Sequence, residues 1–82
     1  EWMAERLEAL LDHMQYGHAA VAYRKQNGSF QLAKATLIYY EAEFHREYDP
    51  TEVEGAVVYW NVDEQRWTTF QVENFMEWRP TV

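Results

Sequence analysis

Hydrophobic residues near the N-terminus recur at steps of three and four, which predicts an amphipathic helix over residues 2–16. Acidic residues fall largely on the opposite face of that helix. The apolar stripe is wider than one small domain obviously needs to bury. We therefore expect that a homo-oligomer, if one forms, uses this stripe, which contains Leu7, Leu10, Leu11 and Met14.

Residues 19–40 show the alternation of a β-hairpin. The turn signal is Asn27-Gly28, a pair that tolerates the positive φ angles of a type I′ turn. The returning strand is expected to run from Phe30 to Tyr40. Its apolar positions change phase after Leu32, and such a change predicts a β-bulge or a sharp bend inside this strand.

The composition changes abruptly at residues 41–55, where six acidic residues accompany a single arginine. Asp49-Pro50 and Gly55 interrupt the segment, so we expect a long acidic surface connection that Phe44 and Tyr48 pin to the body. Strand patterns return over residues 56–79, with a turn at 62–65 and a tight link near residue 74.

One helix followed by five short strands fits a single domain over residues 1–82. Aromatic residues are 17% of the chain, which is enough to build a core in so short a sequence. Strands of this length would curl rather than form a flat sheet. The predicted fold class is mainly β with one N-terminal helix, as a small five-stranded Sm/SH3-like barrel.

Two segments carry a resemblance to a known family. They are AVAYRKQNGSFQLAKATLI, in the first hairpin, and GAVVYWNVDEQRWTTFQVENFMEW, in the C-terminal strands. Both resemble the second WYL-like family of small Sm-like, SH3-type β-barrels, and the resemblance extends over roughly residues 5–79. It implies a phage or mobile-element origin, hence a bacterial cytoplasm, and no established activity. Where the family often carries basic residues, this chain has Thr68 and Gln71.

Composition removes several classes of function. The chain has no cysteine, which excludes disulfides, thiolate nucleophiles and cysteine zinc sites. It has no apolar run long enough to span a membrane. His45 lies among glutamates, but its spacing matches no zinc pattern, and no nucleophile–base arrangement is recognisable. We expect no metal, no cofactor and no enzymatic activity.

The formal net charge of −7 favours a protein partner over nucleic acid. The expected protein interface joins the acidic connection to an exposed aromatic anchor. It comprises Trp67, Arg66, Tyr48, Glu43, Glu47, Asp49 and Glu52. Whether Trp60 and Trp67 face the core or the surface stays open at this point.

The alternative is a nucleic-acid-binding Sm-like module that uses the basic hairpin at residues 23–34. No acidic residue lies between His13 and Tyr40. Cations would contact phosphates there, and an aromatic ring would stack on a base. The residues of this alternative are Tyr23, Arg24, Lys25, Phe30 and Lys34.

Overall fold

The computed structural model describes residues 2–49 and 55–81, with side chains from Glu5 onward. In chain order, the elements are α1 (Trp2–Met14), β1 (His18–Arg24), β2 (Phe30–Thr36), α2 (Tyr40–Phe44), β3 (Ala56–Asn61), β4 (Arg66–Gln71), the 3₁₀ turn η2 (Val72–Asn74) and β5 (Phe75–Pro80). The strands form one antiparallel sheet in the order β4-β3-β2-β1-β5. This arrangement confirms the predicted mainly β fold class with an N-terminal helix.

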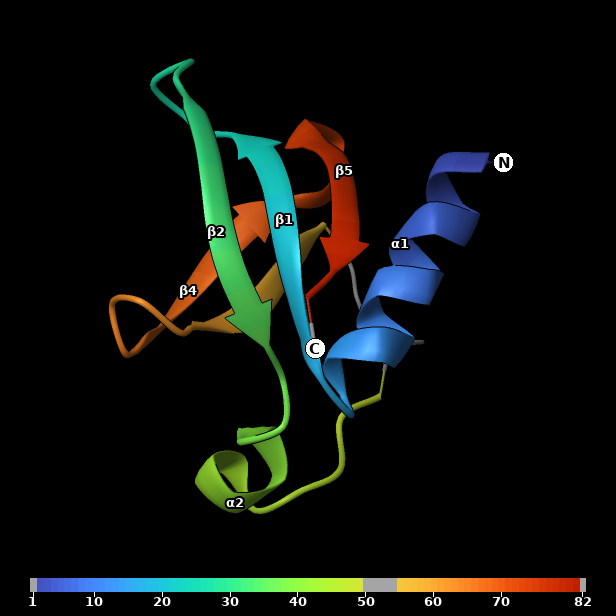
Figure 1. The fold of residues 1–82 in the computed structure, drawn as a ribbon, viewed down its shortest axis with the longest axis vertical. Coiled ribbons are helices and arrows are strands. Elements are labelled where there is room, and N and C mark those ends of the chain that lie inside the picture. The colour runs from blue at the N-terminus through green and yellow to red at the C-terminus, as the bar shows by residue number, and fades with distance from the viewer. Residues whose placement is uncertain (1, 50–54, 82) are drawn as a thin grey trace.

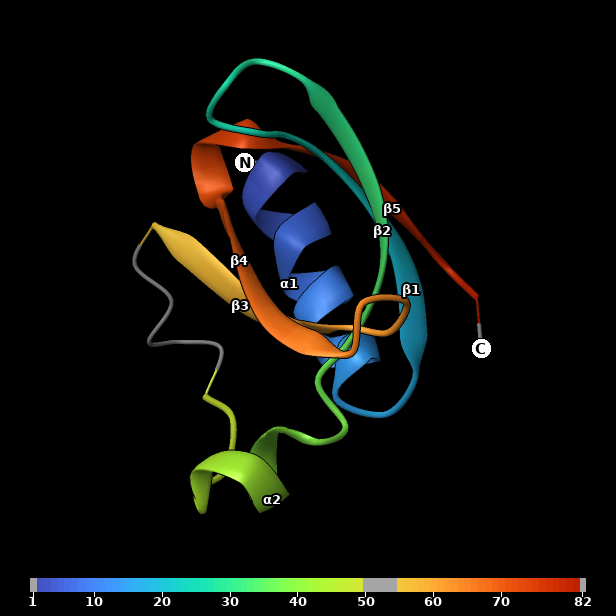
Figure 2. The ribbon, with the colours of Figure 1, turned by 90° about the vertical axis from the view of Figure 1, so that its left-hand side faces the viewer.

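The sheet curls strongly, and α1 lies along its concave side next to β5 (Figure 1). Seen at right angles, the strands make an incomplete ring with α1 behind it (Figure 2). The turn of the β1–β2 hairpin and the α2 segment lie at opposite ends of the longest axis (Figure 1). These two ends carry the two groups of candidate site residues.

The core lies between α1 and the concave face of the sheet. Val21, Val57 and Tyr59 are fully buried there, because alternate residues of β1 and β3 point inward. The apolar stripe of α1 packs against them. Its exposed fractions are 8% for Leu7, 0% for Leu10, 2% for Leu11 and 0% for Met14.

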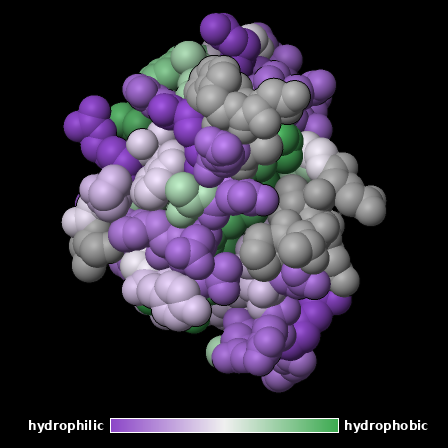
Figure 3. Space-filling view, turned by 90° about the vertical axis from the view of Figure 1, so that its right-hand side faces the viewer, coloured by the Kyte–Doolittle hydropathy of each residue, from purple (hydrophilic) through white to green (hydrophobic). Residues whose placement is uncertain are grey.

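The burial of this stripe corrects the surface that was expected to form a homo-oligomer. Its four described side chains fill the chain's own core and are not available to a second copy. The outer side of the helix carries exposed Glu5, Glu8 and Asp12, and the molecular surface on the α1 side is largely hydrophilic (Figure 3). The stripe is wide because it covers one open side of a curled sheet.

The first hairpin closes with a longer loop than the predicted type I′ turn. Arg24 pairs with Phe30, which leaves five residues between the strands. Gly28 has a φ angle of 90°, but Asn27 is not among the residues with positive φ. Instead, the Asn27 side-chain oxygen accepts hydrogen bonds from the backbone N–H and the hydroxyl of Ser29, at 3.0 and 2.7 Å.

β2 ends at Thr36, four residues before the predicted end of the strand. The Thr36 hydroxyl donates to the Gly17 carbonyl over 2.8 Å and accepts from the Ile38 N–H over 3.2 Å. A turn follows, in which the Tyr40 N–H donates to the Leu37 carbonyl over 3.0 Å. The chain then enters α2, so the expected connection begins with a short helix rather than an irregular loop.

The predicted bulge in the returning strand is wrong. β2 pairs with β1 in continuous register from Phe30 to Thr36. The phase of the pattern changes because Phe30 and Leu32 lie on the outer face of the sheet, where they are 59% and 64% exposed. The irregularity lies instead between β1 and β5, at Ala22 and Tyr23.

Candidate functional site

Aromatic side chains from three elements meet where α2 packs beside the β3–β4 hairpin. The Trp67 ring centroid lies 5.4 Å from that of Trp60 and 5.0 Å from that of Phe44. Tyr40 packs edge-on against Trp67 at 6.1 Å, and Tyr39 packs edge-on against Trp60 at 5.8 Å. The rings hold α2 against the sheet by contacts between residues that are distant in sequence.

The register of the sheet explains why the two tryptophans meet. Trp60 of β3 pairs directly with Trp67 of β4, so their side chains leave the same face of the sheet next to one another. The neighbouring Tyr59 is buried on the opposite, concave face. Trp60 and Trp67 are therefore neither core nor freely exposed. Both are half-buried on the convex side, under α2.

A groove of about 460 Å³ runs between α2 and the β3–β4 hairpin. It is within the usual size range of ligand-binding pockets. We call it the aromatic groove, and it is lined by Tyr39, Ala42, Glu43, Trp60, Val62, Gln65 and Trp67. Tyr39 is 48% exposed, although its ring packs against that of Trp60.

The polar groups of the aromatic groove are few. Glu43 is the one lining residue with a formal charge, and its side chain is exposed. Gln65 adds a neutral amide to the lining. The groove combines an apolar wall, this amide and one carboxylate.

The turn that closes one side of the groove has a defined geometry. Gln65 has a φ angle of 56°, and its N–H donates to the Asn61 carbonyl over 2.7 Å. The Glu64 N–H donates to the Asn61 side-chain oxygen over 2.9 Å. These bonds hold the hairpin tip that faces α2 in one conformation.

Two of the predicted interface residues, Trp67 and Glu43, are brought together in this groove. Sequence reasoning missed Tyr39, because it placed that residue inside a strand. The signal was the pair Tyr39-Tyr40, directly after the apolar Leu37-Ile38. Neighbouring residues of a strand point to opposite faces, so one of these two rings would lie on the outer face.

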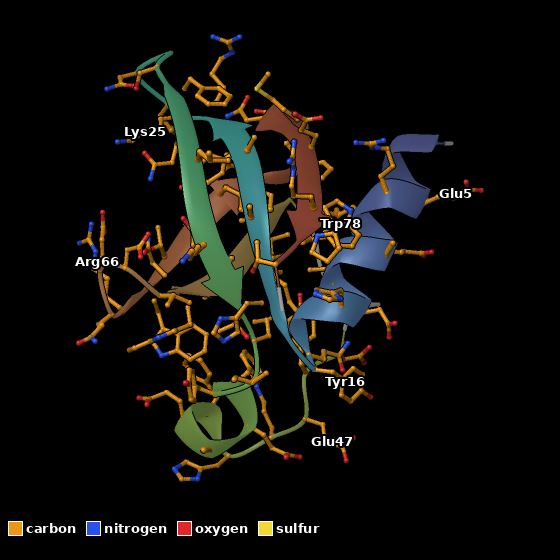
Figure 4. The ribbon with its side chains drawn as sticks, viewed as in Figure 1. Glu5, Tyr16, Lys25, Glu47, Arg66 and Trp78 are labelled. Atoms are coloured by element: carbon orange, nitrogen blue, oxygen red, sulfur yellow. The ribbon has the colours of Figure 1, made fainter. Side chains whose placement is uncertain are left out.

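The other predicted interface residues lie elsewhere. Tyr48 packs edge-on against Tyr40 at 5.1 Å, on the side of α2 away from the groove lining. Glu47 and Asp49 are exposed beside it, and Glu47 points away from the sheet (Figure 4). Arg66 is held by an ion pair with Glu64 over 2.8 Å. Glu52 lies outside the described residues.

The hydroxyl groups of Tyr48 and Tyr59 have raised pKa values. Burial, followed by the nearby Tyr40 and Asp49, raises the pKa of Tyr48 to about 12. Its hydroxyl oxygen is buried and has no hydrogen-bond partner among the described residues. Burial and the hydrogen bond with Tyr23 raise the pKa of Tyr59 further. Both phenols stay neutral at physiological pH, so neither supplies a charge to a ligand.

The basic hairpin is only partly arranged as the nucleic-acid alternative requires. Tyr23 is 5% exposed, and its hydroxyl is 2.8 Å from that of Tyr59, so it cannot stack on a base at the surface. This corrects the role expected for Tyr23. Phe30 and Lys34 are exposed on the outer face of β2, and Lys25 lies near the hairpin turn (Figure 4). Arg24 donates to the Gly28 carbonyl over 2.9 Å.

Trp78 lies outside the aromatic groove and links two elements of the fold. Its indole N–H donates to the Arg6 carbonyl over 3.0 Å, and its ring lies 5.5 Å from that of His13. The side chain thereby joins β5 to α1 (Figure 4). Among the described residues, no group of three or more His, Cys, Asp or Glu is placed to hold a metal ion. No helix in that part of the chain is long and apolar enough to cross a bilayer.

Comparison with known proteins agrees with the fold described above. No curated protein and no solved structure matches the chain. The model of one family, described as WYL_2 with an Sm-like SH3 beta-barrel fold, matches residues 7–76. The match extends from α1 into β5 and includes both the aromatic groove and the basic hairpin. The chain therefore belongs to the WYL_2 family of Sm-like SH3 β-barrel domains.

Proposed function

We propose that this domain is a non-catalytic binding module that recognises a segment of a protein partner in the aromatic groove. The observation that carries the proposal is the half-buried pair Trp60 and Trp67, which lines an open groove instead of filling the core. Tryptophan is enriched at the sites where protein interfaces gain most of their binding free energy. An acidic chain also disfavours nucleic acid over most of its surface.

The rigidity of the groove supports the same function. Trp67 contacts three other rings, and the hairpin tip beside it is fixed by hydrogen bonds to Asn61. A wall that is ordered before binding loses little side-chain entropy when a partner docks. A groove of about 460 Å³ accommodates a few side chains of an extended segment rather than a whole domain surface.

The test selects short peptides from a random displayed library for binding to the intact domain. Binding of the selected peptides should fall at least about tenfold in Trp60→Leu and Trp67→Leu, because each substitution removes a groove wall. Phe30→Leu provides the matched control, since it removes an exposed ring from the opposite end of the molecule. Its affinity should stay within about twofold.

A single-stranded oligonucleotide gives the competing outcome. If it binds in a salt-dependent way, and if Lys25→Gln and Lys34→Gln weaken that binding while the peptides fail to bind, the basic hairpin is the functional surface. That result would replace the protein-binding proposal with the nucleic-acid alternative.

A further inference from the structure

The three groove rings are steeply inclined to one another. The planes of Tyr39 and Trp60 meet at 71°, and those of Trp60 and Trp67 meet at 70°. The lining of the groove therefore contains two indole rings and one phenol ring whose planes differ in direction. Aromatic faces carry negative potential and attract cations, and indole is the best of them.

The one formal charge among the lining residues of the groove has the same sign as the ring faces. Glu43 is the charged lining residue, and Glu41 is exposed on the same short helix. Arg46, the cation of this segment, donates from Nε to the Tyr40 hydroxyl over 3.2 Å and is not among the lining residues. A purely apolar occupant would bury part of Glu43 without compensation, and an anionic occupant would be repelled by it.

A guanidinium group satisfies these features together. It is planar and weakly hydrated, it stacks on aromatic faces, and its fork of N–H donors matches a carboxylate. An ammonium group is more strongly hydrated and makes a point contact. We propose that the groove takes an arginine side chain of the partner protein, stacked on the indole wall and paired with Glu43. This inference rests on the proposed function and adds the group that the groove recognises.

The direct test compares two capped peptides of nearly the same shape, of which only one carries a cationic side chain. Acetyl-Leu-Arg-Leu-amide carries the cation, and the citrulline version replaces its guanidinium by a neutral urea of nearly the same shape. Titration is followed by tryptophan fluorescence of the intact domain. The arginine peptide should bind about tenfold more tightly, from the combined cation–π and carboxylate contacts. Equal affinity of the two peptides would overturn the inference.

Matched charge variants show which carboxylate causes the preference for the arginine peptide over the citrulline peptide. Glu43→Gln should reduce the preference for arginine over citrulline from about tenfold to about threefold, because the stacking contact remains. Glu47→Gln makes the same change of charge at an exposed residue outside the groove lining. It should leave the preference within about twofold of the original. Equal losses in both variants would assign the preference to the overall charge of the domain and overturn the inference.

The peptide selection separates this inference from the function on which it rests. Selected peptides that require Trp67 but contain no arginine would overturn the arginine inference and leave the binding function intact. If no selected peptide requires Trp60 or Trp67, the arginine inference and the proposed binding function both fail. Enrichment of arginine that disappears in a selection on Glu43→Gln would support both.

Discussion

The two ends of the molecule contain similar residue types in different arrangements. At one end, the aromatic groove holds Trp60, Trp67 and Tyr39 in ring contact between α2 and the β3–β4 hairpin. At the other end, Phe30 and Leu32 lie exposed on the outer face of β2, and neither belongs to the ring contacts found in the described residues. In the sequence, each end offered aromatic and charged residues as candidate contacts.

The two ends differ in the elements that wall their hollows. The groove exists because α2 returns over two tryptophans that face each other across β3 and β4. The outer face of β2 has no helix returning over it, and the hollow of about 410 Å³ that Phe30 and Leu32 line there is walled by residues of β1 and β5. The aromatic groove differs in its paired tryptophans, a residue type that is enriched where protein interfaces gain most of their binding free energy.

The largest expected effect concerns the stability that each end contributes. Trp67→Ala should lower the free energy of unfolding by about 2–3 kcal/mol, because it removes ring contacts with Tyr40, Phe44 and Trp60. Phe30→Ala should change it by less than about 0.5 kcal/mol, since that ring is mostly in water. Urea denaturation of both variants measures this. Equal losses would contradict the contrast between the two ends.

The next effect tests whether Tyr23 is structural. Tyr23→Phe should lower stability by about 1–2 kcal/mol, because it leaves the buried Tyr59 hydroxyl without its partner at 2.8 Å. Thermal and urea unfolding measure the change, and peptide affinity should stay within about twofold. A variant as stable as the parent would contradict a structural role for the bond between the two hydroxyls.

A smaller effect involves Tyr48 and alkaline pH. The pKa of Tyr48 is raised from 10.0 to about 12, so between these values the folded chain keeps a proton that the unfolded chain has lost. Stability is therefore complete below about pH 10 and falls as the pH rises towards 12, by about 1 kcal/mol for this partly exposed group.

Tyr48→Phe removes that contribution and isolates it. At pH 7 the variant should be as stable as the parent or slightly more stable, because the lost hydroxyl has no partner among the described residues. Its stability should also fall less steeply above pH 10, although Tyr59 still contributes a decline of the same sign. Urea midpoints across that range measure both effects. A variant with the parent's full alkaline loss would show that Tyr48 does not titrate as described.

The smallest effect concerns Arg66, the cation that the sequence paired with Trp67 as an anchor. Arg66→Ala breaks an exposed ion pair with Glu64, so the cost should be below about 0.5 kcal/mol and should decrease in high salt. Peptide affinity should change by less than about twofold, because Arg66 does not line the groove. A tenfold loss of affinity would extend the site beyond the groove described above.

Much of the fold could be predicted from local patterns. Three patterns each mark an element that the structure contains: the helix stripe, the Asn27-Gly28 signal and the β-branched run after Gly55. Each pattern depends on a few neighbouring residues. Hydrophobic periodicity is strongest for such elements. The errors were in details of geometry, such as the loop type at Gly28 and the early end of β2 at Thr36.

The site was less predictable because its contacts join distant positions. Tyr39 reaches Trp60 across about twenty residues of sequence, and only the turn formed by Thr36 directs it there. Tyr23 and Phe30 could not be sorted into core and surface, because their phase depends on which face of the sheet α1 covers. That choice is made by tertiary packing and not by local propensity.

The most direct test of the central claim is an NMR titration with the arginine peptide that follows the chemical shifts of the four indole N–H groups. We predict that the Trp60 and Trp67 signals shift on titration. The Trp78 signal should stay in place, because that N–H is bonded to the Arg6 carbonyl away from the groove. Backbone shifts should gather at Tyr39 and Glu43. Shifts confined to Lys25, Phe30 and Lys34, with both groove indoles unmoved, would contradict the account.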